Sequence, residues 1–141
     1  MIQRIQTIYL LLSAALLGVF ISLGGSWLLF ASAAFAWLPP VAYGLAGLTA
    51  AAALLSVFLY KQRDQQHRVI TAAQWLDLVL VLVLGVTFGM LSYRTDTDLA
   101  TVDIGALVVL LCPVVAYVFL RLAQRGVRKD IELVRSMDRL R

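Results

Sequence analysis

The chain has 141 residues, of which 62% are hydrophobic and only 14% are charged, and its mean hydropathy is +0.89. Soluble domains are roughly half apolar and about a quarter charged, so this composition excludes an ordinary soluble protein and indicates a membrane protein. The length suits one integral membrane domain over residues 1–141, with about four spans of ~20 residues and no separate soluble domain.

The first apolar run opens the chain, and we expect a transmembrane helix over residues 5–23. Gly24-Gly25-Ser26 then interrupts the helix. The next piece, residues 27–38, is too short to cross a bilayer and carries Trp27 and Trp37 near its ends. Because indole rings prefer the membrane–water boundary, we expect this outer segment to lie along the interface or to fold back against the bundle.

Pro39-Pro40 ends the outer segment, and because proline is tolerated in the first turn of a helix, the second span is predicted over residues 41–60. The polar stretch 61–68 is expected to be a loop. It leads into a third span over residues 71–93, and a short polar turn separates this from a fourth span over residues 102–122. The predicted fold is therefore all-α, with four transmembrane helices.

The basic residues predict the orientation of these spans. Arg4, three residues of the central loop and seven residues from Arg121 to Arg141 fall on one side, which makes eleven of the 12 Lys and Arg residues. Arg94 falls on the other side. Cytoplasmic loops carry the excess of Lys and Arg, so both termini are expected in the cytoplasm. Continuous apolar runs, rather than alternating strands, point to the bacterial inner membrane.

The tail, residues 123–141, has apolar residues on one half of a helical wheel and basic residues on the other. We expect a cytoplasmic amphipathic helix that lies along the membrane surface and binds anionic lipid, docks on the bundle or meets a cytosolic protein. Nucleic acid is not expected, because no aromatic stacking residue is interleaved with the charges. The candidate lipid or partner contacts are Arg125, Arg128, Lys129, Arg135 and Arg139.

Asp77 is the acidic residue that lies well within the cytoplasmic half of a predicted span. A carboxylate at the bilayer centre costs roughly 2.5 to 3.5 kcal/mol on insertion scales, so such a residue needs a reason to be there. It pairs with Arg4 or Arg121, or it serves a proton or ion relay. Our hypothesis is a polar cluster under the bundle, formed by Gln3, Arg4, Asp77 and Arg121.

Gly85 and Gly89 form a GxxxG pattern within the third span. In lipid, helices associate through close approach of their backbones, which small residues permit. The pattern predicts helix packing, either within one bundle or between copies in a homo-oligomer.

No motif places a nucleophile beside a base, and no glycine-rich phosphate loop is present, so the chain is not expected to be an enzyme or to bind a cofactor. His67 has no further ligand at metal-binding spacing, and Cys112 is the single cysteine. The leading hypothesis is a non-enzymatic assembly, anchoring or modulating component. The alternative is a small oligomeric transporter or channel that uses Asp77 and a fourth helix kinked at Pro113.

Both ends of the chain have a distinctive sequence. Residues 1–12, MIQRIQTIYLLL, and residues 128–141, RKDIELVRSMDRLR, resemble the two ends of small four-helix membrane proteins of the Bacteroidota, domain-of-unknown-function family 4293. The resemblance implies four spans and an inner-membrane location. It implies no activity, ligand or catalytic residue.

Overall fold

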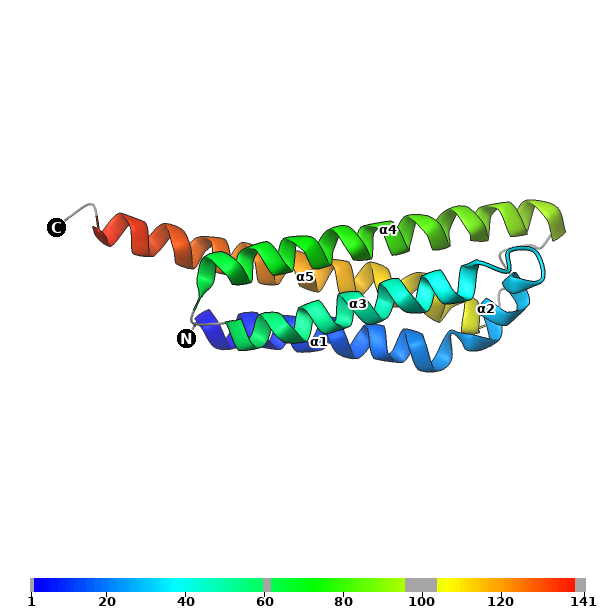
Figure 1. The fold of residues 1–141 in the computed structure, drawn as a ribbon, viewed down its shortest axis with the longest axis horizontal. Coiled ribbons are helices and arrows are strands. Elements are labelled where there is room, and N and C mark those ends of the chain that lie inside the picture. Colours follow the sequence, from blue (N-terminus) through cyan, green and yellow to red (C-terminus); the bar gives the residue numbers. More distant parts are fainter. Residues whose placement is uncertain (1, 60–61, 96–103, 139–141) are drawn as a thin grey trace.

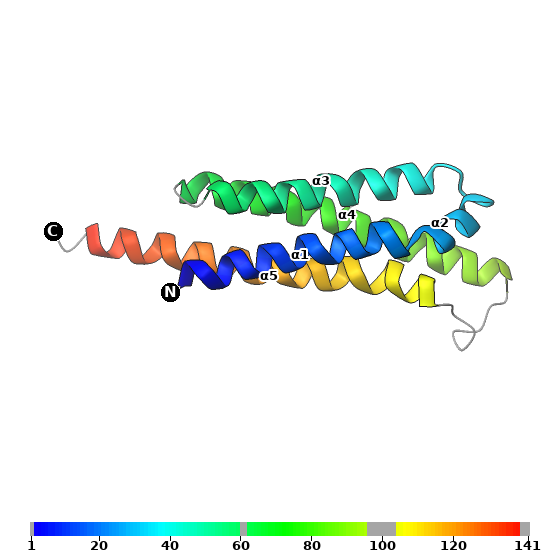
Figure 2. The ribbon, with the colours of Figure 1, turned by 90° about the horizontal axis from the view of Figure 1, so that it is seen from below.

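A computed structural model describes residues 2–59, 62–95 and 104–138. The described residues form five helices and no strand: α1 (Ile2–Leu23), α2 (Gly25–Ser32), α3 (Leu38–Phe58), α4 (Arg63–Thr95) and α5 (Ile104–Asp138). The four long helices lie side by side as an antiparallel bundle (Figures 1 and 2). In it α1 packs against α3, α3 against α4, α4 against α5, and α5 against α1, so the ring of helices is closed.

The core of the bundle follows from a repeat in the sequence. Buried residues in each long helix recur at alternating steps of mostly three and four, which keeps one stripe of the helix facing inward as in a coiled coil. In α4 this stripe includes Ile70, Ala73, Asp77, Leu80 and Leu84. Asp77 therefore occupies a core position, between an alanine and a leucine.

The outer surface of the bundle is apolar. Large hydrophobic side chains such as Ile8, Leu48, Leu82 and Leu111 are exposed, and in water such a surface would drive aggregation. Within the described ranges, four stretches are long and apolar enough to cross a bilayer: Ile5–Leu23, Leu38–Phe58, Arg63–Tyr93 and Gly105–Val134. The chain is a multi-pass membrane protein, with lipid as the solvent of its outer face.

Helix α2 packs against the bundle. In α2, Trp27, Leu28 and Ala31 are buried, and the ring centroid of Trp27 lies 6.0 Å from that of Phe88 on α4. The turn before α2 requires a glycine at position 24. A Cβ added there would lie 3.0 Å from a methyl group of Val109 on α5 and 2.6 Å from the Phe20 carbonyl oxygen.

Two predicted boundaries are different in the structure. The stretch 61–68 is mostly helix rather than loop, since α4 begins at Arg63, and Asp64 in its first turn favours a helix start. The tail is not a separate surface helix either. It continues α5 to Asp138 and extends past the other helices along the bundle axis (Figures 1 and 2), because no helix-breaking residue separates it from the span.

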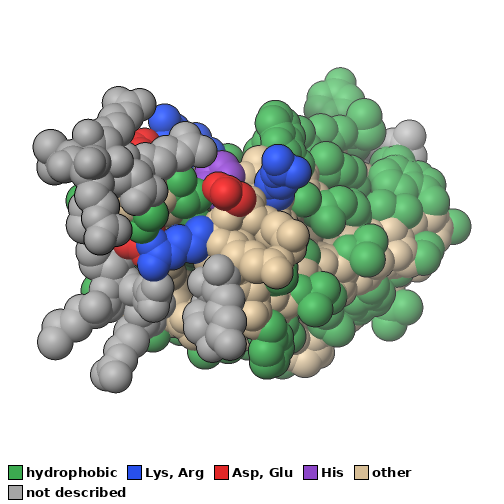
Figure 3. Space-filling view, turned by 60° about the vertical axis from the view of Figure 1, so that its left-hand side comes forward, with side chains coloured by type: hydrophobic (Ala, Val, Ile, Leu, Met, Phe, Trp, Pro, Cys, Tyr) green, Lys and Arg blue, Asp and Glu red, His purple; other side chains and the backbone are tan. Residues whose placement is uncertain are grey.

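One end of the bundle collects charge. The start of α1, the end of α3, the start of α4 and the last turns of α5 lie at this end (Figures 1 and 2). Figure 3 shows basic, acidic and histidine side chains gathered there beside an apolar surface. We call it the basic end and the opposite one the α2 end. The basic side chains described at this end are Arg63, Arg68, Arg121, Arg125, Arg128 and Lys129.

Candidate functional site

Three adjoining hollows follow the contact between α4 and α5 at the basic end. We call them the outer, middle and inner hollows of the α4–α5 groove. Their volumes are about 480, 210 and 240 Å³, respectively. His67 and Arg128 line both the outer and the middle hollow, and Arg121 and Gln124 line both the middle and the inner one. The three are therefore one continuous groove.

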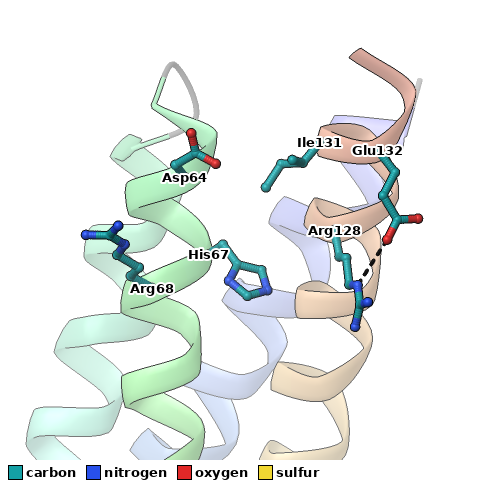
Figure 4. A pocket seen from close by; sticks show the side chains of 6 residues that line it. All are labelled: Asp64, His67, Arg68, Arg128, Ile131 and Glu132. Atoms are coloured by element: carbon teal, nitrogen blue, oxygen red, sulfur yellow. Dashed lines mark hydrogen bonds and ion pairs between the residues drawn. The ribbon is translucent and has the colours of Figure 1, made fainter. Parts of the chain in front are cut away.

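The outer hollow carries charges of both signs (Figure 4). The His67 ring and the Ile131 side chain point into the gap between the helices, whereas the guanidinium of Arg68 points away from α5. Arg128 forms an ion pair with Glu132, with Nε and Oε1 3.0 Å apart. Both side chains are exposed, and such a surface pair stabilises a helix by only about 0.3–0.5 kcal/mol, so Arg128 is easily recruited by another anion.

The middle hollow is the cationic part of the groove. It is lined by Arg121, Arg125, Arg128, His67 and Gln124, with no carboxylate among these residues. Arg125 is exposed and makes no hydrogen bond or ion pair within the part of the chain that the structure describes. An anion that enters this hollow would meet three guanidinium groups, one of which is unpaired.

The inner hollow has a hydrogen-bonded floor and apolar walls. Gln74 Nε2 donates to the Leu120 carbonyl oxygen at 2.9 Å, and Gln124 Nε2 donates to Thr71 Oγ1 at 2.8 Å. Arg121 Nη1 donates to Gln124 Oε1 at 3.1 Å. The first two bonds join α4 to α5, and the third lies within α5. The apolar walls come from Trp75, Leu78 and Tyr117.

Comparison with known proteins assigns the chain. The family described as "Domain of unknown function (DUF4293)" matches residues 2–140, nearly the whole chain. The chain belongs to this family. No curated protein and no solved structure matches it. The resemblance read from the two ends of the sequence is thus confirmed for the DUF4293 family, whereas an origin in the Bacteroidota stays a prediction.

In this DUF4293 chain the structure does not form the predicted pair between Asp77 and Arg121. Asp77 is 0% exposed, and neither of its carboxylate oxygens has a hydrogen-bond partner among the described residues. Arg121 instead points along the groove and bonds to Gln124, with Gln74 Oε1 3.5 Å away. The helix register explains this, since Asp77 lies one turn beyond Gln74 and on the core side of α4.

The other half of the predicted cluster lies at a different level. Gln6 Nε2 donates to Asp130 Oδ2 at 3.4 Å, so the first turn of α1, with Gln3 and Arg4, lies near Asp130 on α5. Asp77 lies beyond the level of Leu120, and a rise of ~1.5 Å per residue separates these levels by about 20 Å. The two members whose side chains are described, Asp77 and Arg121, are not paired. The side chains of Gln3 and Arg4 themselves lie outside the described residues.

The contact of Gln6 with Asp130 joins the N-terminal segment to the tail, as the predicted cluster requires, although the sequence did not predict this particular pair. A Cβ added at Gly126 would lie 2.8 Å from Gln6 Cγ, so the glycine makes room for the glutamine to reach Asp130. A glycine within an otherwise strong helical pattern was the available signal, because glycine costs about 1 kcal/mol there unless close packing requires it.

The remaining candidate residues of the DUF4293 chain are the basic residues of the tail and the two glycines of α4. Arg125 and Arg128 line the groove, whereas Lys129, although exposed, lines none of the three hollows. The side chains of Arg135 and Arg139 lie outside the described residues. Gly85 and Gly89 are exposed, and a Cβ at either would meet nothing within 4 Å. Packing within one bundle is therefore not their role, and association between copies stays a prediction.

Proposed function

We propose that this chain is a non-enzymatic component of the bacterial inner membrane that anchors or assembles another molecule at its basic end. The observation that carries the proposal is the α4–α5 groove, which combines three arginines with no carboxylate in its middle hollow. Arginine is the preferred residue for planar, bidentate recognition of carboxylate and phosphate, so a groove of this kind suits an anionic ligand.

The basic end faces the cytoplasm in this proposal. Basic residues accumulate in cytoplasmic segments, and eleven of the 12 Lys and Arg residues belong to the two terminal segments and the central polar stretch 61–68. The extension of α4 and α5 past the apolar surface then presents the outer hollow to the cytoplasm and leaves the inner hollow beside lipid.

The non-enzymatic part of the proposal rests on the sequence. It contains no nucleophile beside a base and no phosphate-binding loop. What the groove offers instead is fixed positive charge, which binds and orients an anion without needing to change protonation.

Native membranes provide the test. The full chain would be extracted with its surrounding lipid and purified as wild type, as Arg125→Glu and as the control Lys129→Glu, which makes the same charge change outside the groove. We expect a stoichiometric protein partner with wild type and with the control, and its loss with Arg125→Glu. Purification of all three variants without a partner would overturn the assembly role.

Asp77 favours a second candidate function, a small transporter or channel. A carboxyl group that is fully buried in a span and has no described partner is a functional candidate by default. Proton flux into vesicles that contain the purified chain, and its loss in Asp77→Asn, would support transport. Equal flux in wild type, in Asp77→Asn and in empty vesicles would refute it.

A further inference from the structure

The middle hollow lies at a level where α1 is apolar on its outer face. Gln6 meets both Gly126 and Asp130, so Arg128, which lies between them in α5, is level with the start of α1. Ile5, next to Gln6, is exposed. At this level the bundle therefore has an apolar surface on the α1 side and arginine side chains on the α4–α5 side.

Helix α3 also has an exposed apolar side chain at the level of the middle hollow. Gln66 Nε2 donates to the Ser56 carbonyl oxygen at 3.0 Å, so His67, which follows Gln66, is level with this part of α3. Leu55, the neighbour of Ser56, is exposed. Apolar surface on two helices thus reaches as far as the middle hollow. The groove is a cationic notch at the edge of the lipid-facing band rather than a cleft that lies wholly in water.

The groove also changes character along its length. Three arginines line the middle hollow, and toward the α2 end the inner hollow is walled by Trp75, Leu78 and Tyr117. Beyond it, Leu82 and Val114 continue the exposed apolar surface of α4 and α5. A ligand that matches this sequence of surfaces has an anionic head and an apolar tail.

We propose that the α4–α5 groove binds one anionic phospholipid, with its phosphate in the middle hollow against Arg121, Arg125 and Arg128. One acyl chain lies in the inner hollow along Trp75 and toward Leu82. This inference rests on the proposed function, because it names the ligand that the basic end holds. Basic hollows between helices on the cytoplasmic side are suited to lipid head groups.

The charge of the groove supports a phosphate. Its lining residues include four arginines and two carboxylates, Asp64 and Glu132, and both carboxylates lie in the outer hollow. The middle hollow thus keeps uncompensated positive charge. A free phosphate or an acidic peptide would satisfy the arginines but has no acyl chain to lie along the apolar walls of the inner hollow.

Trp75 is a natural probe for the lipid. It lines the inner hollow, and the chain has three tryptophans, so Trp27→Phe with Trp37→Phe leaves Trp75 as the single emitter. This variant would be placed in phosphatidylcholine bilayers that contain a small fraction of phosphatidylglycerol with brominated acyl chains, which quench indole fluorescence on contact. Brominated phosphatidylcholine at the same fraction is the neutral-lipid control.

We expect phosphatidylglycerol to quench Trp75 beyond its mole fraction, and phosphatidylcholine in proportion to it. Each basic residue near an anionic membrane surface contributes about a five-fold preference, so Arg125→Gln should weaken the effect by about that factor, and high salt should weaken it too. Lys129→Gln, which removes one charge outside the groove, should weaken the effect less than Arg125→Gln does. Retention of phosphatidylglycerol by the unaltered chain, measured by native mass spectrometry, checks the result without the tryptophan substitutions.

Three outcomes would overturn the inference. These are equal quenching by both lipids, an equal loss in Arg125→Gln and Lys129→Gln, and displacement of the lipid by inorganic phosphate alone, which would make the ligand a soluble anion. If a protein partner is lost with Arg125→Glu and no lipid preference is measured, this inference is wrong and the proposed function stands. If the wild-type chain has neither a protein partner nor a lipid preference, both this inference and the proposed function are wrong.

Discussion

Two aspartates lie inside the bundle in contrasting surroundings. Asp77 is 0% exposed and has no described hydrogen-bond partner, whereas Asp130 is 9% exposed and accepts a hydrogen bond from Gln6. An ion that is buried without a partner costs several kcal/mol, whereas an unbonded amide costs about 1–3 kcal/mol. The two sites should therefore respond differently to the same substitution.

We expect Asp77→Asn to raise the free energy of unfolding by on the order of 1–2 kcal/mol, because the amide keeps the shape of the side chain and cannot ionise in the core. Thermal unfolding in detergent would measure it. Asp130→Asn is the matched control and should lower stability by about 1 kcal/mol, because it weakens a charge-assisted hydrogen bond. A fall in stability with Asp77→Asn would instead show that the carboxyl group has a partner in the folded chain.

Single residues show the limit of sequence reasoning. Composition alone marks Asp77 as unusual, because acidic residues are rare in spans. Whether it has a partner depends on which face of α4 it occupies and on the register of α4 against α5, which the Gln74–Leu120 hydrogen bond sets. The sequence contains no comparable signal for that register.

At the scale of elements, the junction of α1 with α2 depends on Gly24. A methyl group there would lie 3.0 Å from Val109 Cγ2 and 2.6 Å from the Phe20 carbonyl oxygen, so Gly24→Ala should cost about 1–3 kcal/mol of stability. Gly18→Ala is the control, because nothing lies within 4 Å of its added Cβ, and it should be neutral or stabilise by up to ~1 kcal/mol. Equal effects in thermal unfolding would refute the close approach of α1 to α5.

A separate prediction concerns the exposed pair on α4. If copies associate through Gly85 and Gly89, Gly85→Leu with Gly89→Leu should lower energy transfer between labelled chains in bilayers without lowering monomer stability. Gly44→Leu on α3, where the added Cβ also meets nothing within 4 Å, is the control. Unchanged energy transfer in the double variant would exclude this face as a contact between copies.

Helix identity was predictable and helix ends were less so. Apolar runs of about 20 residues identify the four long helices from composition alone. The first turns of α4 and the last turns of α5 are polar, so they look like a loop and a surface tail in the sequence, but residues 63–68 contain no helix breaker, and Gly126, the glycine that follows Pro113, does not end α5. Gly126 is used for packing against Gln6 rather than for a turn.

At the scale of the whole molecule, the start of α1 and the end of α5 both lie at the basic end (Figures 1 and 2). Under the proposed orientation, reporters fused before Met1 and after Arg141 should both respond as cytoplasmic, and a reporter within the connection 96–103 should respond from the opposite side. A C-terminal reporter and a 96–103 reporter in the same compartment would contradict four spans. The groove itself could not be predicted at this scale, because it forms between helices whose register the sequence leaves open.

The closed ring joins α1 to α5. Of the helices that the structure describes, α1 is synthesised before the others and α5 after them. The inward stripe of α1, which includes Leu10, Leu17 and Phe20, therefore lacks its α5 partner in the bilayer until α5 has been synthesised. A nascent chain that stalls before α5 leaves this stripe uncovered, which makes incomplete chains prone to misassembly and readily distinguished from finished ones by membrane quality control.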